Sequence, residues 1–358
     1  MQTSSPKADA SPVRRSPAEQ AAIMRAMTSI EEASLLAPSP AARAAAAPIT
    51  GQYDNYWAET AFAVLEREEI TPSTFDEVRR RLSIREFVLN AGWGLKQLGR
   101  QGSPLKSLWR RLRLSLAQRR QPGLTEVGYV ELVGRAPRIE HGRQIVGTLG
   151  EAVDGAARMT LEAVAPLVDS DTLIVDLGSG WGRYSIAFCA AFPGIEVVSG
   201  ELTASGRRST ALVAEKARLP ITSVPFDYYA HANIIDVVAA SPRRNVVVFS
   251  SHSIEQVPYL DRAMFDDFLA LEGKRVTFVH IEPVGWQIAG PANDADMSRP
   301  PNAADGPYGG YNRNLFLIML TLAGEGKVVI ERAEPYYFAA INTRNTGALI
   351  VARSTRQA

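Results

Sequence analysis

Short apolar runs that end in polar residues recur through the second half of the chain. They lie at residues 173–175, 195–198, 221–226, 245–250 and 275–281. Apolar runs of this length, next to glycines and turns, predict buried parallel strands. Two more runs, at 327–331 and 347–352, are joined by a connection too short for a helical crossover, so they should pair antiparallel. The pattern predicts an α/β fold with a doubly wound, seven-stranded, mostly parallel sheet that ends in an antiparallel C-terminal hairpin.

The loop after the first of these strands is the most informative segment. It follows Asp176 and places Gly178, Gly180 and Gly182 in alternation. Glycine reaches positive φ and lets a ligand approach the main chain closely. A helix that begins near Gly182 presents free N–H groups to an anionic or polar ligand group. The segment therefore predicts a ligand-cradling strand, loop and helix, although dinucleotide-binding folds also carry such a loop.

Acidic residues at the ends of the next two strands help to decide which ligand-binding fold carries this loop. Glu201 ends the second strand and Asp227 ends the third. Together with Asp176 and its glycines, this succession resembles the class I S-adenosylmethionine (SAM)-dependent methyltransferases over residues 150–353. The C-terminal hairpin is similar to theirs too, whereas a dinucleotide-binding sheet would continue with another strand–helix–strand unit.

The resemblance implies SAM as the cofactor. The glycine loop would wrap its methionine part, Glu201 would bind the ribose hydroxyls and Asp227 the adenine amino group. The candidate cofactor-binding residues are Asp176, Gly178, Ser179, Gly180, Gly182, Glu201, Leu202, Asp227, Tyr228 and Ser250.

The catalytic centre should lie beyond the carboxyl ends of the parallel strands, where the loops meet the cofactor. His252 follows the fourth strand and is the candidate general base, because an imidazole of ordinary pKa, about 6.5, accepts a proton near neutral pH. Glu255 or Glu282 would orient it. The alternative is that His252 only bonds to backbone at a strand end. We see no aspartate pair of the sort that metal-dependent O-methyltransferases use and predict no metal; by residue type, a metal site at these three residues is the alternative.

A long stretch without regular pattern follows the fifth strand, at residues 283–310. Long loops in a compact domain are usually functional or disordered. Candidate substrate-binding residues here and just beyond are Trp286, Tyr308, Tyr311 and Asn312. The alternative interpretation is a mobile surface insertion.

The first third of the chain has a different character. Residues 1–50 are rich in Ala, Pro and Ser and predict a disordered or loosely helical tail. Residues 51–121 show helical periodicity and form a basic accessory region, which ends at a Pro-Gly break before a methyltransferase domain at 122–358. Its basic helices admit three interpretations: a cap with solvent-facing arginines, a docking surface for an acidic or phosphorylated substrate, or a membrane or nucleic-acid surface.

Composition bounds the remaining classes. The net charge is +1, and the single cysteine, Cys189, excludes an intramolecular disulfide and fits a cytoplasmic protein. No apolar run is long enough to span a membrane, and the N-terminus has no apolar signal core. Nucleic acid is disfavoured as a partner, because the basic run is short and carries few aromatics. A homodimer is left open.

The sequence therefore predicts a SAM-dependent methyltransferase. The expected acceptor is a hydroxyl or carboxyl oxygen of a small molecule or modified peptide in specialised metabolism. The alternatives are a protein or peptide N-methyltransferase, and a SAM-binding regulatory or scaffold protein without catalysis.

Overall fold

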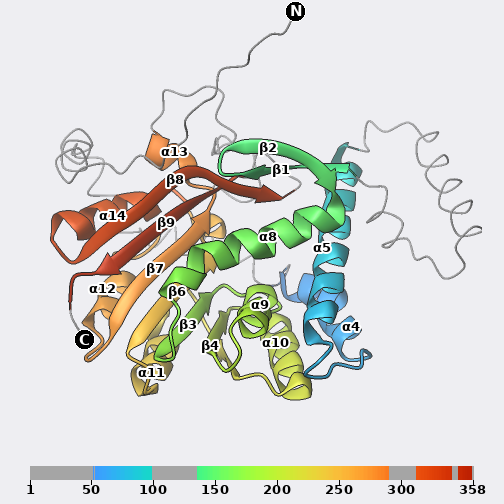
Figure 1. Ribbon diagram of the computed structural model, residues 1–358, viewed down its shortest axis with the longest axis horizontal. Helices are drawn as coiled ribbons and strands as arrows, with labels where there is room; N and C mark the ends of the chain where they lie inside the picture. The colour runs from blue at the N-terminus through green and yellow to red at the C-terminus, as the bar shows by residue number, and fades with distance from the viewer. Residues whose placement is uncertain (1–50, 52, 99–134, 290–311, 341–345, 357–358) are drawn as a thin grey trace, which may run out of the picture.

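The fold is built on one mixed sheet, seen in a computed structural model that describes residues 51, 53–98, 135–289, 312–340 and 346–356 (Figure 1). The nine strands follow the order β2-β1-β8-β9-β7-β6-β3-β4-β5. Their bounds are β1 Arg135–Glu140, β2 Arg143–Thr148, β3 Thr172–Leu177, β4 Glu196–Glu201, β5 Ile221–Pro225, β6 Asn245–Ser251, β7 Arg275–Glu282, β8 Val328–Ala340 and β9 Gly347–Ser354.

The parallel part of the sheet brings the predicted strand ends together. β3 pairs in parallel with β4 on one side and β6 on the other, while β5 and β7 extend the parallel set. Leu177 lies opposite both Gly200 and Ser250, so the loops after β3, β4 and β6 leave the same edge side by side. β9 pairs antiparallel with both β7 and β8.

The predicted count of seven strands was wrong, because two additional strands extend the sheet beyond β8. β1 and β2 pair through a two-residue turn at His141 and Gly142, whose φ values are +47° and +73°. Positive φ at both central residues is the turn geometry that matches the twist of a hairpin. β8 runs to Ala340, well past the predicted apolar run, and its last residues pair with β1. β1 and β2 are rich in polar residues, so no apolar run signalled them.

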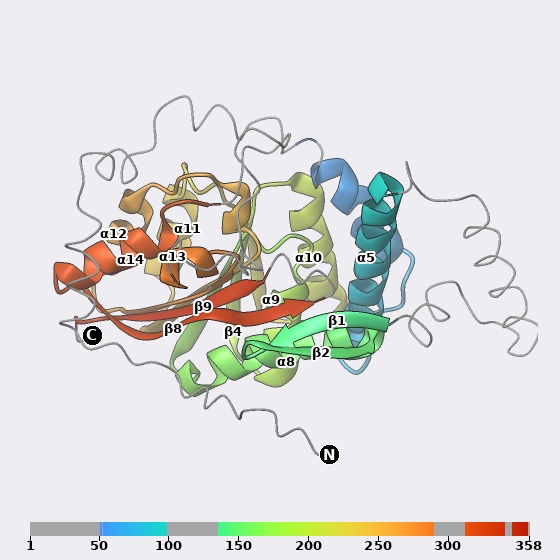
Figure 2. The same ribbon diagram turned by 90° about the horizontal axis from the view of Figure 1, so that it is seen from above.

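Helices cover both faces of the sheet (Figures 1 and 2). α8 (Leu149–Val164) and α9 (Arg183–Ala191) share one apolar cluster with Ile174. α11 (Ala232–Ala240), α12 (Arg262–Ala270) and α14 (Leu315–Gly324) share another with Val175. Adjacent residues of β3 thus face opposite layers, as the two-residue period of a strand requires. α10 (Ala204–Ala217) connects β4 to β5.

The N-terminal segment packs directly against this core. It comprises the π-helical turn η1 (Ala58–Phe62), α4 (Ala63–Leu65) and α5 (Phe75–Leu98). Leu82 of α5 is buried in a cluster with Trp181 and with Val213 of α10. Three of the basic residues there are paired: Arg79 with Asp76, Arg80 with Asp154 and Arg81 with Glu68. The tail at 1–50 and the boundary at residue 121 lie outside the described residues.

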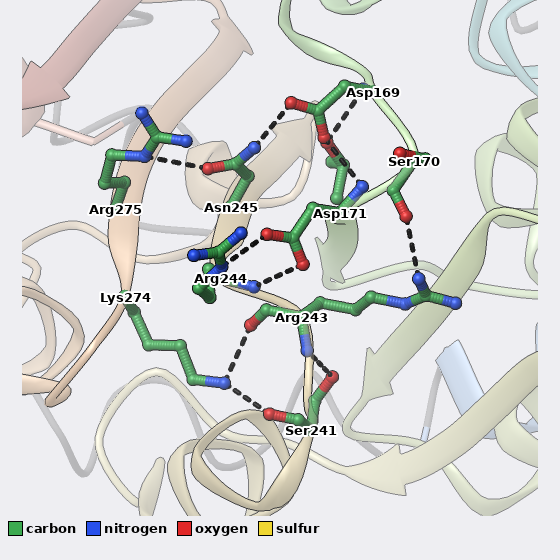
Figure 3. A network of polar contacts seen from close by, with 10 residues as sticks. Asp169, Ser170, Asp171, Ser241, Arg243, Arg244, Asn245, Lys274 and Arg275 are labelled. Carbon is green, nitrogen blue, oxygen red and sulfur yellow. Dashed lines mark hydrogen bonds and ion pairs between the residues drawn. The ribbon is translucent and has the colours of Figure 1, made fainter. Parts of the chain in front are cut away.

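A polar network ties the amino ends of β3, β6 and β7 together, opposite the predicted site (Figure 3). Asn245 donates to Asp169 at 2.6 Å, and Arg244 donates to Asp171 at 2.7 Å. Lys274 donates to two backbone carbonyls, those of Ser241 and Arg243. These contacts hold strands of similar length in register, so their carboxyl ends also align. Within the described part of the chain, no helix is both long and apolar enough to cross a bilayer.

Candidate functional site

The glycine loop between β3 and α9 has a conformation that only glycine adopts without strain. Gly178, Gly180 and Gly182 have φ values of +68°, +59° and +87°. Space is also lacking at Gly178, where a Cβ would lie 2.5 Å from the Cβ of Ser253. The backbone N–H groups of Gly178 and Ser179 donate to the carbonyl of Gly200 at 2.8 and 3.0 Å. The loop is therefore fastened to the end of β4.

Asp176 lies under this loop as a buried acid. Its side chain accepts a hydrogen bond from Ser185 Oγ at 2.6 Å, which ties it to the first turns of α9. Burial raises the pKa of Asp176 to about 6, although the bonds from Ser185 oppose the rise. Asp176 is 2% exposed, so it shapes the loop from below.

Glu201 joins the glycine loop to the start of α10. Its two oxygens accept bonds from Gly180 N at 2.9 Å and from Thr203 N and Oγ1 at 2.8 and 2.7 Å. Burial raises the pKa of Glu201, while the three donors oppose this. Leu202, the next residue, is 44% exposed. A buried carboxylate therefore lies beside an exposed apolar side chain at the end of β4.

The end of β5 contributes one surface residue and one buried residue. Asp227 is half-buried, and its Oδ1 accepts a bond from Tyr229 N at 2.8 Å. The hydroxyl of Tyr228 is 2.6 Å from Ser253 Oγ, and it donates to Leu177 O at 3.3 Å. Tyr228 thus packs beneath the glycine loop, and Asp227 lies nearer the surface.

A buried polar cluster connects the ends of β6 and β7. Ser250 Oγ lies 2.8 Å from His280 Nδ1 and donates to Glu282 Oε1 at 2.8 Å. Burial lowers the pKa of His280 to about 3, so its ring is neutral near pH 7. The His280 ring also stacks on Phe278. The Ser250 side chain is fully buried, and its hydroxyl is engaged by these two partners.

Glu282 organises the loop that follows β6. It accepts bonds from Ser253 N at 3.2 Å and Glu255 N at 3.3 Å, besides the one from Ser250. Burial raises the pKa of Glu282 to about 7, and the positive charge of His252 limits the rise. The carboxylate is fully buried, so it acts on the loop and on His252 rather than on solvent.

His252 projects from this loop with a left-handed backbone, at φ +51°. Its Nδ1 lies 3.4 Å from Glu255 Oε2, and its side chain is 25% exposed. Burial acts to lower the pKa of His252, but the bond to Glu255 and the charges of Glu255 and Glu282 outweigh it and raise the pKa. The structure thus brings the three predicted catalytic residues together, with an imidazole that reaches solvent.

The predicted substrate residues are less fully described. Trp286 belongs to the short helix α13 (Gly285–Ala289), and Tyr308 and Tyr311 lie outside the described residues. Asn312 is buried: its Nδ2 donates to Val257 O at 2.8 Å, and its Oδ1 accepts from Leu315 N at 2.8 Å. The second of these bonds satisfies the first backbone N–H of α14.

Sequence reasoning missed the contribution of the N-terminal segment. Glu86 of α5 accepts a bond from Trp181 Nε1 at 2.9 Å and lies 3.5 Å from Arg183 Nη1. Trp181 belongs to the glycine loop, and Arg183 is the first residue of α9. The Trp57 ring contacts Gly180. In the sequence, the aromatic residues Tyr53, Tyr56 and Trp57 are the signal that this segment packs against another part of the molecule. In the described ranges, no group of three or more His, Cys, Asp or Glu side chains could hold a metal ion.

Comparison with known proteins finds no matching family model and no matching curated protein. Among solved structures, the chain resembles the mitomycin 7-O-methyltransferase MmcR at 16% identity and a TM-score of 0.33, covering 57% of this chain and 56% of that one. It also resembles an O-methyltransferase from Bacillus cereus in complex with SAH, at 12% identity and a TM-score of 0.38, covering 56% of this chain and 81% of that one. A third similar structure is that of the O-methyltransferase TomG from Streptomyces achromogenes, which is involved in tomaymycin synthesis and is in complex with SAM. The identity is 16% and the TM-score 0.37, covering 57% of this chain and 81% of that one. The chain thus spans little more than half the length of the first of these, and at such identities the likeness concerns the fold alone.

Proposed function

We propose that this chain is a SAM-dependent methyltransferase that acts on a hydroxyl or carboxyl oxygen of a small molecule or modified peptide in specialised metabolism. The observation that carries the proposal is the junction of Gly180 and Glu201. There a loop residue in the left-handed conformation, at φ +59°, donates its backbone N–H to a buried carboxylate at the neighbouring strand end. A donor with a methionine part and a ribose needs main-chain contact for one and a hydroxyl acceptor for the other.

The remaining strand ends fit the same ligand. Leu202 offers an exposed apolar side chain for a flat ring, and Asp227 offers a half-buried carboxylate for an amino group. The strand order also supports it, since the glycine loop leaves the sheet at β3, from which the parallel strands run outward in both directions. Ligands of open α/β sheets bind at such a switch point. When bound, SAM supplies an electrophilic methyl group.

His252 is the proposed general base for a hydroxyl acceptor. Its Nδ1 lies 3.4 Å from Glu255 Oε2, a carboxylate that would orient the imidazole and stabilise it once it has taken the proton of the acceptor. Glu282 holds the loop that carries it. A carboxylate acceptor would need no base. The loss of turnover on replacing His252 therefore distinguishes a hydroxyl acceptor from a carboxylate acceptor.

Calorimetry with SAM tests the proposal directly. Glu201→Ala should weaken SAM binding at least about tenfold, because each charged hydrogen bond to a ribose hydroxyl is worth roughly 1.5–3 kcal/mol. Glu201→Gln keeps one acceptor oxygen and should lose less. Glu215→Ala, an exposed change on α10, is the matched control. Equal affinity of wild type and Glu201→Ala would refute the assignment.

Catalysis is tested separately, with labelled SAM and a panel of hydroxyl and carboxyl acceptors. Methyl transfer to an oxygen supports the enzyme. SAM binding with no transfer to any acceptor or to lysate protein would favour the regulatory alternative.

A further inference from the structure

The N-terminal segment reaches across the candidate cofactor site. A Cβ on Gly180 would lie 3.0 Å from Cζ2 and 3.4 Å from Cε2 of Trp57, so the indole ring rests on the backbone of the glycine loop. Tyr56 packs edge-on against this indole with ring centroids 4.7 Å apart, and Tyr53 lies 6.4 Å from it. An aromatic cluster from residues 53–57 therefore covers the loop.

The same segment is fastened to the second ligand loop, the one after β4. Asp54 Oδ1 accepts bonds from Ser205 N at 2.8 Å and Ser205 Oγ at 2.7 Å. Ser205 Oγ lies 2.6 Å from the carbonyl of Asp54 as well. The bonds from Ser205 lower the pKa of Asp54, so the anchor is ionised at neutral pH. Ser205 is in the first turn of α10, four residues after Glu201.

The far end of the segment is held too. Lys216, near the end of α10, donates to the carbonyls of Leu65 and Glu68, each at 2.9 Å. Between the anchors, Phe62 packs under the guanidinium of Arg208 at 4.4 Å. The segment therefore lies along α10, and its aromatic end sits where Gly180 and Glu201 meet. Figure 2 shows α5 and the blue N-terminal segment on the same side of the molecule as α10.

We propose that residues 53–57 form the outer wall of the cofactor pocket and that the Trp57 indole covers the bound methyl donor. The inference rests on the proposed function, because it assumes that a SAM-like ligand binds at Gly180 and Glu201. A ligand there must lie next to the ring that already touches Gly180. An aromatic face attracts a cation, such as the sulfonium of SAM, and shields it from water. The N-terminal region is then part of the binding site.

The test is SAM affinity and dissociation rate in Trp57→Ala and Trp57→Phe. Because Trp57→Ala removes the aromatic face that would attract the cation, it should weaken SAM binding at least about tenfold and speed the release of SAM. Trp57→Phe keeps an aromatic face and should stay within about threefold of wild type. Glu59→Ala, an exposed change on the same segment, is the control and should bind SAM as wild type does.

A second measurement works even if Trp57→Ala is unstable. SAM should change the tryptophan emission of the wild type, and most of that change should vanish in Trp57→Phe. Wild-type affinity in Trp57→Ala together with an unaltered emission change in Trp57→Phe overturns the inference. If Glu201→Ala still loses binding, the proposed function survives that result. A wild type that does not bind SAM would defeat the proposed function itself.

Discussion

His252 combines three features that a single residue in a loop does not ordinarily combine. Its backbone is left-handed, its ring is three-quarters buried, and two carboxyl groups raise its pKa. A non-glycine residue with positive φ is uncommon and holds its place only when its surroundings determine it. Here the surroundings are the bonds from the loop to Glu282.

His252→Ala should lower turnover by about 10²–10⁴-fold while SAM affinity stays nearly constant, if the acceptor is a hydroxyl. Single-turnover methyl transfer at saturating SAM measures this. Glu255→Gln, which keeps the shape but weakens the partner of Nδ1, should have a smaller effect. A rate within about threefold of wild type in His252→Ala would argue for a carboxylate acceptor or for catalysis by positioning alone.

Glu282 makes a prediction about stability and pH. Its pKa rises from 4.5 unfolded to about 7 folded, so between these values the folded state holds more of its proton. The contribution of this group to stability is therefore fully present below pH 4.5 and is lost as pH rises through about 7. Asp176, with its pKa raised to about 6, acts with the same sign at lower pH.

The unfolding free energy of Glu282→Gln should accordingly depend less on pH than that of wild type between pH 5 and 8, by roughly 1–3 kcal/mol over the range. Urea unfolding at several pH values measures it. Asp176→Asn should flatten the curve mainly in the acid half of the range. Parallel curves for wild type and Glu282→Gln would contradict the burial of an ionisable carboxyl here.

At the scale of elements, the corner between β2 and α8 shows how the extra strands are fixed. Thr148 accepts a bond from Glu151 N, and Glu151 Oε2 accepts from Thr148 N at 2.6 Å, a reciprocal capping box. Gly147 sits inside this corner, where a Cβ would clash with Arg138 and Glu151. The cap starts α8 at the residue where β2 ends.

Thr148→Ala should lower the unfolding free energy by about 1 kcal/mol, because it leaves a helix N–H without its side-chain acceptor. Glu151→Gln should cost less, since an amide oxygen can still accept from Thr148 N. Thermal unfolding of both variants against wild type measures the difference. A Thr148→Ala protein as stable as wild type would mean that the cap adds nothing beyond the packing of α8.

Whole-molecule architecture rests on α5 as much as on the sheet. Leu82 and Val78 are buried against Trp181, Ile186 and Val213. Ile84 packs with Leu149 and Val153 of α8. An accessory region with its own core would unfold separately, whereas one that shares this core should unfold with the sheet.

Leu82→Ala should therefore destabilise the entire protein by about 2–5 kcal/mol and keep a single transition. Val146→Ala, at a side chain that is 61% exposed, should change stability by less than about 0.5 kcal/mol. Calorimetry and tryptophan fluorescence should give coincident transitions in each variant. Two separate transitions would show that the N-terminal segment folds as an independent unit.

The local signals in the sequence were enough for the parallel strands, the glycine loop and the position of His252 beyond a strand end. Apolar runs bury themselves, and glycines at alternate positions permit one loop geometry, so both are properties of short segments. The placement of Glu201 beside that loop also follows once the strands are parallel, because parallel strands end at one edge.

Only the tertiary structure decided the rest. β1 and β2 are polar, and they became strands because β8 runs long enough to offer them an edge. The sequence suggested Glu282 as a partner for an imidazole, yet its main contacts are a hydroxyl donor at the end of β6 and backbone donors in the loop after it. Trp57 lies next to Gly180 although more than a hundred residues separate them in the sequence. Contacts of that kind depend on how whole layers pack, and no period or spacing within a segment records them.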